Sequence, residues 1–265
     1  MQMKQIYQLI LAFLGLFAFS IVVYSASLAG YGFGGLRFAD IQNLFFILFS
    51  FVAFAAAALN IRIFGIKAVE GRVWLFLAVG MLFWFLSEAA WFVDQSLFGI
   101  TPFPSMAVLF FGLGFLFLFA ALLTEFSIIK ALINPPVLLY PLILSVFFAL
   151  PSFFSSIVPF ITAPQYAGLP GVLTALFPLA DILLFFLALV IIVVFWGSKA
   201  SVHWTIIGIS LAFFAIADSL FPHLELSRLY YQLFFVADLL WFFAYLLFAF
   251  GALVYRGVLR GRIYG

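Results

Sequence analysis

The chain has 265 residues, of which 68% are hydrophobic and only 8% are charged, and its formal net charge is +2. Soluble domains average about 25% charged residues, so this composition excludes a water-soluble globular protein. The basic residues lie in short loops rather than in one patch, which argues against a nucleic-acid partner. Cysteine is absent, and this excludes disulfides, thiolate metal sites and thiol nucleophiles.

Apolar runs between turn-forming segments predict an all-α, polytopic membrane helix bundle with eight transmembrane helices in a single domain. The mean hydropathy is +1.35, and runs of about 20 apolar residues are long enough to cross a bilayer core. The abundance of Phe and the scarcity of thermolabile polar residues favour a thermophilic archaeon or bacterium. The expected spans, in chain order, are 6–29, 42–65, 73–97, 105–130, 137–158, 171–196, 203–222 and 229–255.

The first expected span, 6–29, has a second interpretation. Lys4 would be the charged start of a signal peptide, and "YSAS" its cleavage site. The apolar stretch is longer than the usual core of roughly 7–15 residues, which favours an uncleaved helix. Cleavage would leave seven helices with the same orientation.

The third expected span carries Glu88 inside the apolar stretch "FWFLSEAAWFVDQSLFG". Trp84 and Trp91 share its helical face, because they lie four residues before it and three after it. A carboxylate in hydrocarbon is costly, so Glu88 requires a partner, a proton, water or a ligand.

Three more acids are expected within the membrane: Asp181 in the sixth span, Asp218 in the seventh and Asp238 in the eighth. From the helical rise, Glu88 and Asp218 lie about 22 Å from the inner face of the membrane. Asp181 and Asp238 lie about 14 Å deep, measured from the outer face. These depths overlap and predict one acidic pocket in the outer leaflet. Pro178, close to Asp181, predicts a break in the sixth helix.

No basic residue is expected at the depth of these acids, so they are protonated, hydrogen-bonded, wet, or bound to a cation or a donor ligand. Aromatic neighbours would attract an organic cation to the same place. The alternative is a structural role, in which a protonated carboxyl group is hydrogen-bonded across a helix interface. The predicted ligand-binding set is Glu88, Trp91, Asp181, Asp218, Asp238, Trp241 and Tyr245.

The sequence predicts no catalytic residue, metal site or cofactor. His203 and His223 are expected about 30 Å apart, at opposite ends of the seventh span, so they cannot ligate one metal in a monomer. "GYGFGG" lacks the context of a phosphate-binding motif and is expected to be a loop.

Positive charge predicts that both termini are cytoplasmic. With the N-terminus inside, only Arg37 and Arg228 of the 11 Lys and Arg residues fall in outer segments. The basic tail is then expected to bind a cytoplasmic signalling partner, the subunits of a membrane complex or the anionic inner leaflet. It consists of Arg256, Arg260 and Arg262.

A weak internal repeat appears when the chain is shifted by 130 residues. Trp74 then falls on Trp204, and Glu88 falls on Asp218. Four helices in each half would face the same way, which predicts a parallel 4+4 repeat of 1–134 and 135–265 about an axis along the membrane normal.

Two segments carry a family resemblance: "FLSEAAWFVDQSLFGITPFPSMAVLFFGLGFL" and "AIADSLFPHLE…YYQLFFVADLLWFFAYLLFAFG". Their pairing resembles prokaryotic multi-helix membrane sensory modules, in which an acid-bearing helix leads through a Pro-Ser turn into an Ala-Asp-Leu helix. Such modules precede diguanylate cyclase or histidine kinase domains. The resemblance covers 74–125 and 204–254, and it departs at Val108, where an Asp is expected. It implies a signal sensor, here acting through a separate partner.

Three functions follow from these features. The first is a sensory or ligand-binding membrane module with an outer acidic pocket. The second is a transporter or channel for a proton, a cation or a small amine, which requires polar groups in the inner half; there the sequence offers only Asn60, Thr124 and Glu125. An enzyme acting on lipid is the least favoured, because clustered His and an acidic metal motif are missing.

Overall fold

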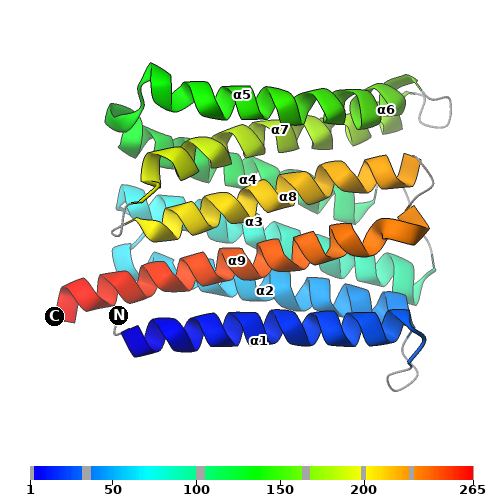
Figure 1. Cartoon of the computed structure of the whole chain (residues 1–265), viewed down its shortest axis with the longest axis horizontal. Helices are drawn as coiled ribbons and strands as arrows, with labels where there is room; N and C mark the ends of the chain where they lie inside the picture. Colours follow the sequence, from blue (N-terminus) through cyan, green and yellow to red (C-terminus); the bar gives the residue numbers. More distant parts are fainter. Residues whose placement is uncertain are drawn as a thin grey trace. The chain divides into compact units, whose positions relative to one another are not determined.

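The computed structural model describes residues 3–31, 37–99, 105–162, 168–197, 201–226 and 230–264. Within these ranges the protein is helical and contains no strand (Figure 1). Eight helices are long and apolar enough to cross a membrane, which confirms the predicted number of spans in the described part of the chain. The α-helices are α1 (Met3–Leu28), α2 (Phe38–Phe64), α3 (Val69–Phe92), α4 (Met106–Ile129), α5 (Pro135–Ser152), α6 (Val158–Thr162), α7 (Leu169–Phe195), α8 (Val202–Leu226) and α9 (Tyr230–Tyr264).

Three short segments depart from α-helical geometry. Two are π-helical: η1 (Val93–Leu97) extends α3, and η3 (Phe153–Ile157) joins α5 to α6. The third, η2 (Lys130–Leu132), is a 3₁₀ turn that ends α4. With η3 included, the fifth candidate span runs over Pro135–Thr162, longer than the predicted 137–158. Single-turn π segments inside helices often mark functional or strained places.

The predicted break at Pro178 is wrong. Helix α7 runs through this residue from Leu169 to Phe195 without interruption. A proline removes one backbone donor, but neighbouring helices and small local adjustments can satisfy the freed carbonyl group in a membrane helix. Irregular backbone lies instead in the third span, at η1, and in the fifth span, where η3 follows Pro151.

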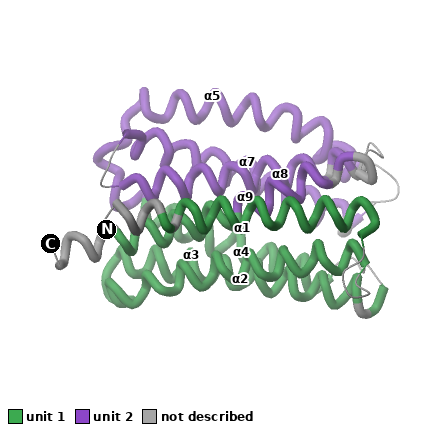
Figure 2. Tube along the Cα trace, turned by 60° about the horizontal axis from the view of Figure 1, so that its bottom comes forward, with its two compact units in different colours: residues 1–125, 245–265 green, residues 126–244 purple. Residues whose placement is uncertain are grey.

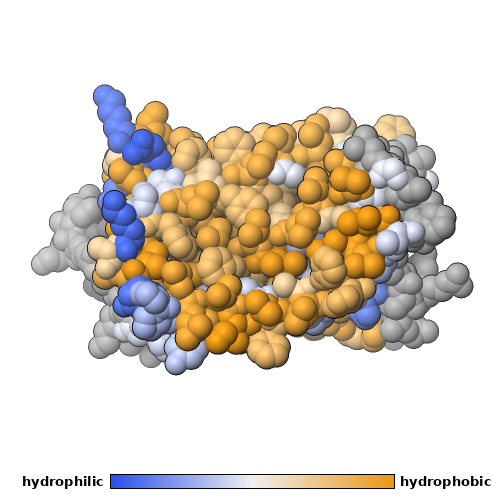
Figure 3. Space-filling view, turned by 90° about the horizontal axis from the view of Figure 1, so that it is seen from above, coloured by the Kyte–Doolittle hydropathy of each residue, from blue (hydrophilic) through white to orange (hydrophobic). Residues whose placement is uncertain are grey.

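Apolar side chains dominate the exposed surface, as a lipid-facing protein requires. On α5, for example, Phe147 is 70% exposed and Leu142, Leu144 and Leu150 are also exposed. The face in Figure 3 is apolar over its middle, and hydrophilic residues gather at one end of it. Buried positions, by contrast, include polar residues such as Asn60 and Ser210. The protein is therefore a multi-pass membrane protein in contact with the lipid bilayer.

The chain divides into two compact units (Figure 2). Unit 1 comprises residues 1–125 and 245–265, and unit 2 comprises residues 126–244. Helix α9 therefore contributes its first part to unit 2 and its last part to unit 1. Within unit 1, α1 begins and α9 ends at the same end of the unit (Figure 1).

Close helix contacts within each unit depend on glycine. In unit 1, a Cβ atom at Gly114 of α4 would overlap Cδ1 of Trp84 on α3, so the missing side chain makes room for the indole ring. In unit 2, a Cβ atom at Gly208 of α8 would lie 2.8 Å from Cγ1 of Ile192 on α7. Small residues at helix interfaces are the usual means of close packing in membranes.

Candidate functional site

The predicted ligand-binding residues are distributed over both units. Glu88, Trp91 and Tyr245 belong to unit 1. The other four belong to unit 2: Asp181, Asp218, Asp238 and Trp241. Each unit thus carries acids and aromatic side chains of its own.

In unit 1, Glu88 on α3 is bonded to Tyr245 on α9. The Tyr245 hydroxyl donates a hydrogen bond of 2.9 Å to Oε1 of Glu88. The two side chains are 9% and 1% exposed. The sequence placed Tyr245 in the predicted ligand-binding set, but it gave no partner for its hydroxyl group.

Trp84 forms one wall of this contact. Its ring meets the Tyr245 ring edge-on, with centroids 6.2 Å apart and an interplanar angle of 90°. Its indole Nε1 donates to the backbone oxygen of Phe111 on α4 at 3.3 Å. Trp84 was not in the predicted ligand-binding set, although its spacing of four residues from Glu88 was the signal for it. Trp91, which was in that set, is partly buried on α3.

Ser87, the residue immediately before Glu88 on α3, fixes this helix to α4. Ser87 is fully buried, and its hydroxyl donates a 2.6 Å hydrogen bond to the backbone oxygen of Ala107. Together with the bond from Trp84 to Phe111, this gives α3 two polar attachments to α4. Two hydrogen bonds to α4, from Trp84 and Ser87, therefore fix α3 just before Glu88.

In unit 2, Asp181 lies on α7 and has an exposed fraction of 0%. Both of its carboxyl oxygens lack a hydrogen-bond donor among the described residues. The group that interacts with it electrostatically is another acid, Asp218 on α8. Helices α7 and α8 pack along each other within this unit. Two acids therefore meet across one helix interface.

Asp218 has a donor from a third helix. Nε1 of Trp241 on α9 donates to Oδ1 of Asp218 at 2.5 Å. The Trp241 ring packs against Phe221, with centroids 5.7 Å apart. Asp218 is partly buried, whereas Asp181 is completely buried. Asp238, also on α9 in unit 2, is 1% exposed.

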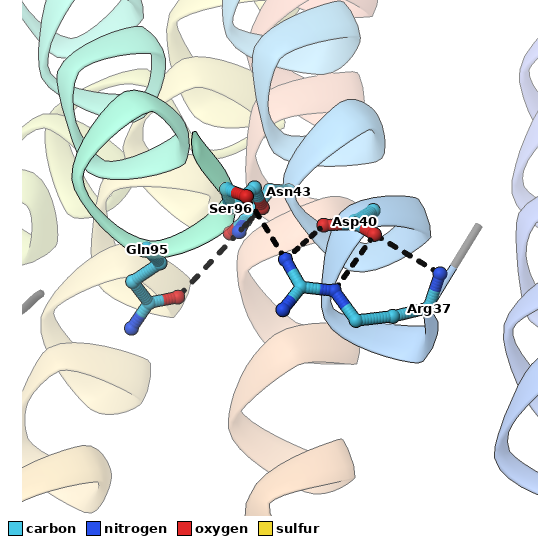
Figure 4. A network of polar contacts seen from close by, with 5 residues as sticks. All are labelled: Arg37, Asp40, Asn43, Gln95 and Ser96. Atoms are coloured by element: carbon cyan, nitrogen blue, oxygen red, sulfur yellow. Dashed lines mark hydrogen bonds and ion pairs between the residues drawn. The ribbon is translucent and has the colours of Figure 1, made fainter. Parts of the chain in front are cut away.

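A polar network that the sequence reading did not predict lies at the start of α2 (Figure 4). Arg37 and Asp40 form an ion pair of 3.0 Å, and Nη2 of Arg37 also donates to the backbone oxygen of Ser96 in η1. Asn43 donates to Gln95 and to the hydroxyl of Ser96. The hydrogen bond and the charge of Asp40 raise the pKa of Arg37 above its usual value.

This network explains why α2 begins at Phe38, before the predicted residue 42. Asp40 caps the start of the helix, because its Oδ2 accepts a 3.0 Å hydrogen bond from the Arg37 backbone N–H. The feature of the sequence that could have predicted this start is an acid, Asp40, three residues after the cap position. The network holds the start of α2 against η1 in unit 1.

Unit 1 also buries polar groups near the ends of α2 and α4. Asn60 donates to the backbone oxygen of Ala252 at 2.9 Å, and its Oδ1 has no partner in the described part of the chain. Glu125 is 5% exposed. Arg256 donates to the backbone oxygen of Leu59 at 2.9 Å. The side chains of Arg260 and Arg262 lie outside the described residues.

The two histidines lie at opposite ends of α8: His203 is buried and His223 is exposed. Among the described residues, no three His, Asp or Glu side chains are arranged to hold a metal ion. Comparison of the chain with protein-family models, with curated proteins and with solved structures gives no match. The functional evidence therefore consists of the acid–aromatic contacts inside the two units.

Proposed function

We propose that this protein is a membrane sensory or ligand-binding module that binds a small cationic ligand through its buried acids. It acts through a separate partner or as a subunit of a membrane complex. The observation that carries the proposal is Asp181, a fully buried carboxyl group without a hydrogen-bond donor whose interacting neighbour is a second acid.

The acid pair in unit 2, Asp181 and Asp218, has no cationic side chain among the groups that act on it. Ionisable groups inside a membrane are costly, and they commonly mark substrate or ion pathways. Asp181 and Asp218 together carry up to two negative charges, while Trp241 supplies one hydrogen-bond donor to the pair. A cationic ligand would supply the charge and the donors that this pair lacks.

Unit 1 offers a second acid–aromatic contact that suits the same ligand class. Glu88 accepts from Tyr245, and the ring of Trp84 packs on Tyr245. Aromatic faces attract organic cations by roughly 0.5–2 kcal/mol. Trp91 and Asp238 complete the proposed set, as a partly buried aromatic residue and a buried acid.

The proposal places both termini in the cytoplasm on the basis of the positive-inside rule. It assigns to Arg256, Arg260 and Arg262 the binding of a cytoplasmic partner or of anionic lipid. The resemblance of 74–125 and 204–254 to prokaryotic sensory modules supports a sensor. In this reading the acidic contacts lie toward the outer leaflet, and the signal leaves through the inner end.

The proposal is tested by thermal unfolding of the protein in lipid nanodiscs with sodium, potassium, tetramethylammonium and propylammonium ions. A ligand at about 100 times its Kd stabilises the folded protein by about 2.7 kcal/mol. We expect one of these ions to raise Tm in wild type and to lose this effect in Asp181→Asn. Asp94→Asn, at a partly buried acid in unit 1, is the matched control and should keep the effect. Equal responses of wild type and Asp181→Asn would reject the proposal.

A second candidate function is transport of a proton, a cation or a small amine. It is favoured by Asn60 and Glu125, which are buried polar groups near the ends of α2 and α4, toward the proposed inner face. Proteoliposomes distinguish the two functions. A transporter moves the stabilising ion across the bilayer, and Glu125→Gln slows that flux. A sensory module binds the ion without moving it.

A further inference from the structure

We infer that, in the ligand-free protein, Asp181 and Asp218 hold one proton between them, with Asp181 protonated and donating a hydrogen bond to an ionised Asp218. This inference rests on the proposed function, because it describes the resting state of the same ligand site. It adds a consequence: a cation that binds there displaces one proton.

The geometry of unit 2 requires a donor between the two acids. An ionised carboxylate only accepts hydrogen bonds, so neither acid can satisfy the other while both are charged. This is why both Asp181 oxygens lack a donor although the Asp218 carboxyl group interacts with them. A single proton converts the contact into an O–H···O⁻ bond, which is among the stronger kinds of hydrogen bond.

The charges of the two acids also indicate that they share a single proton. Two like charges in contact at a site of low dielectric repel each other, and pairs of acids at such sites commonly retain one proton. Two protons would leave the pair neutral, but Asp218 already accepts a hydrogen bond from the indole of Trp241. A donor of this kind favours the ionised form of the acid that receives it.

Trp241 therefore decides which acid carries the proton. Its N–H points at Asp218, while Asp181 receives no donor from any described residue. Asp181 is also the more deeply buried of the two, and burial favours its neutral form. The proton belongs on Asp181, and the remaining negative charge belongs on Asp218.

Other titratable groups on the helices around the pair do not supply the missing charge. Helices α5, α6 and α8 and the segment η3 pack against α7, and α6 and η3 carry no titratable side chain. Asp218 acts on Asp181, and Trp241 and Asp181 act on Asp218. The remaining described titratable groups on these helices and on the unit 2 part of α9 are Tyr140 on α5, His203 and His223 on α8, and Asp238 on α9.

The consequence for binding is an exchange that balances in charge and protons. A monovalent cation enters, the proton leaves Asp181 for the solvent, and two carboxylates then face the bound cation. The affinity for the cation should therefore rise up to tenfold for each unit of pH while Asp181 stays protonated in the free protein.

Infrared spectroscopy of the protein in nanodiscs, recorded in H₂O and in D₂O, tests the resting proton. A protonated carboxyl group gives a C=O band apart from that of a carboxylate, and the band shifts on deuteration. We expect Asp181→Asn to remove one such band from the wild-type spectrum. Asp218→Asn should keep the band but move it, because the protonated group loses its charged acceptor. Glu88→Gln, in unit 1, is the control for a buried acid outside the pair.

Three outcomes would overturn the inference: no band attributable to Asp181 in the wild type, a band removed by Asp218→Asn but not by Asp181→Asn, or cation affinity independent of pH. The first outcome can be tested in wild type alone, so it does not depend on a variant that folds. A saturating cation displaces the proton from Asp181 and should remove its band. If wild type binds a cation but shows no Asp181 band in the ligand-free state, the inference fails and the proposed function stands. A band without any cation binding rejects the proposed function and leaves the protonated pair.

Discussion

At the scale of single residues, the buried acids differ in the donors that they receive. Glu88 accepts a hydrogen bond from Tyr245, and Asp218 accepts one from Trp241, whereas Asp181 receives none from the described residues. A buried acceptor that loses its donor costs more than the bond itself contributes. The donors on α9 should therefore matter for stability, and Asp181 should matter for binding.

Tyr245→Phe tests the first of these roles. The substitution keeps the ring against Trp84 but removes the hydroxyl group that donates to Oε1 of Glu88, so we expect a loss of about 1–3 kcal/mol in the free energy of unfolding. The measurement is reversible unfolding in mixed micelles. In a double-mutant cycle, Tyr245→Phe should cost much less when Glu88→Leu is already present. Equal costs in both backgrounds would show that the hydroxyl does not act through Glu88.

At the scale of secondary-structure elements, glycine decides how closely α3 and α4 approach. A Cβ atom at Gly114 would overlap Trp84, while a Cβ atom at Gly112 on the same helix would meet nothing within 4 Å. This pair separates the effect of packing from that of helix propensity, because both sites gain the same methyl group. Overpacking of this kind costs about 1–3 kcal/mol.

We therefore expect Gly114→Ala to lower the free energy of unfolding by about 1–3 kcal/mol and to weaken the hydrogen bond from Trp84 to Phe111. Gly112→Ala should leave stability unchanged or raise it slightly, since alanine is the better helix former. Unfolding midpoints and tryptophan fluorescence report both effects. If the two variants unfold alike, the close approach of α3 and α4 is not limited at Gly114.

The polar network between the start of α2 and η1 should limit local opening of these two segments. Arg37→Ala removes the ion pair with Asp40 and the bond to the backbone oxygen of Ser96. Amide hydrogen exchange should become faster in η1 and in the first turn of α2, and it should stay unchanged in α7. Lys67→Ala, at an exposed cation away from this network, serves as the control. Unchanged exchange in η1 would mean that the polar network does not hold this segment.

Sequence patterns predicted the elements better than their contacts. The eight spans were predictable because a membrane helix must be long and apolar whatever its neighbours are. The start of α2 was missed because its cap uses an arginine, and the break at Pro178 was wrong because helix packing tolerates that proline. The partner of Tyr245 was not predictable, since periodicity shows which residues share a face but not which helix lies opposite.

At the scale of the whole molecule, the number of spans and the distribution of charge determine the proposed topology. Eight candidate spans in the described part of the chain would return it to the side on which it began, as the positive-inside rule also predicts. The natural chain contains no cysteine, so single cysteines can report sidedness without a background. This makes the proposed orientation directly measurable.

Labelling of single-cysteine variants in intact cells should follow the positive-inside orientation. Tyr31→Cys and Phe98→Cys, at exposed positions beside α1 and η1, should react with a membrane-impermeant maleimide added outside. Lys67→Cys and Lys130→Cys should react only after the membrane is permeabilised. The opposite pattern would reverse the proposed topology and place the acidic contacts toward the inner leaflet.

The central claim is that Asp181 and Asp218 form a binding site for a cation, and calorimetric titration of the protein in nanodiscs measures this most directly. The titrant is the ion that raises Tm in wild type. The account predicts that the site formed by Asp181 and Asp218 binds the ion in wild type, that its Kd is at least tenfold weaker in Asp181→Asn, and that its Kd is unchanged in Asp94→Asn. Absence of binding in wild type, or the same Kd in wild type and Asp181→Asn, would contradict it.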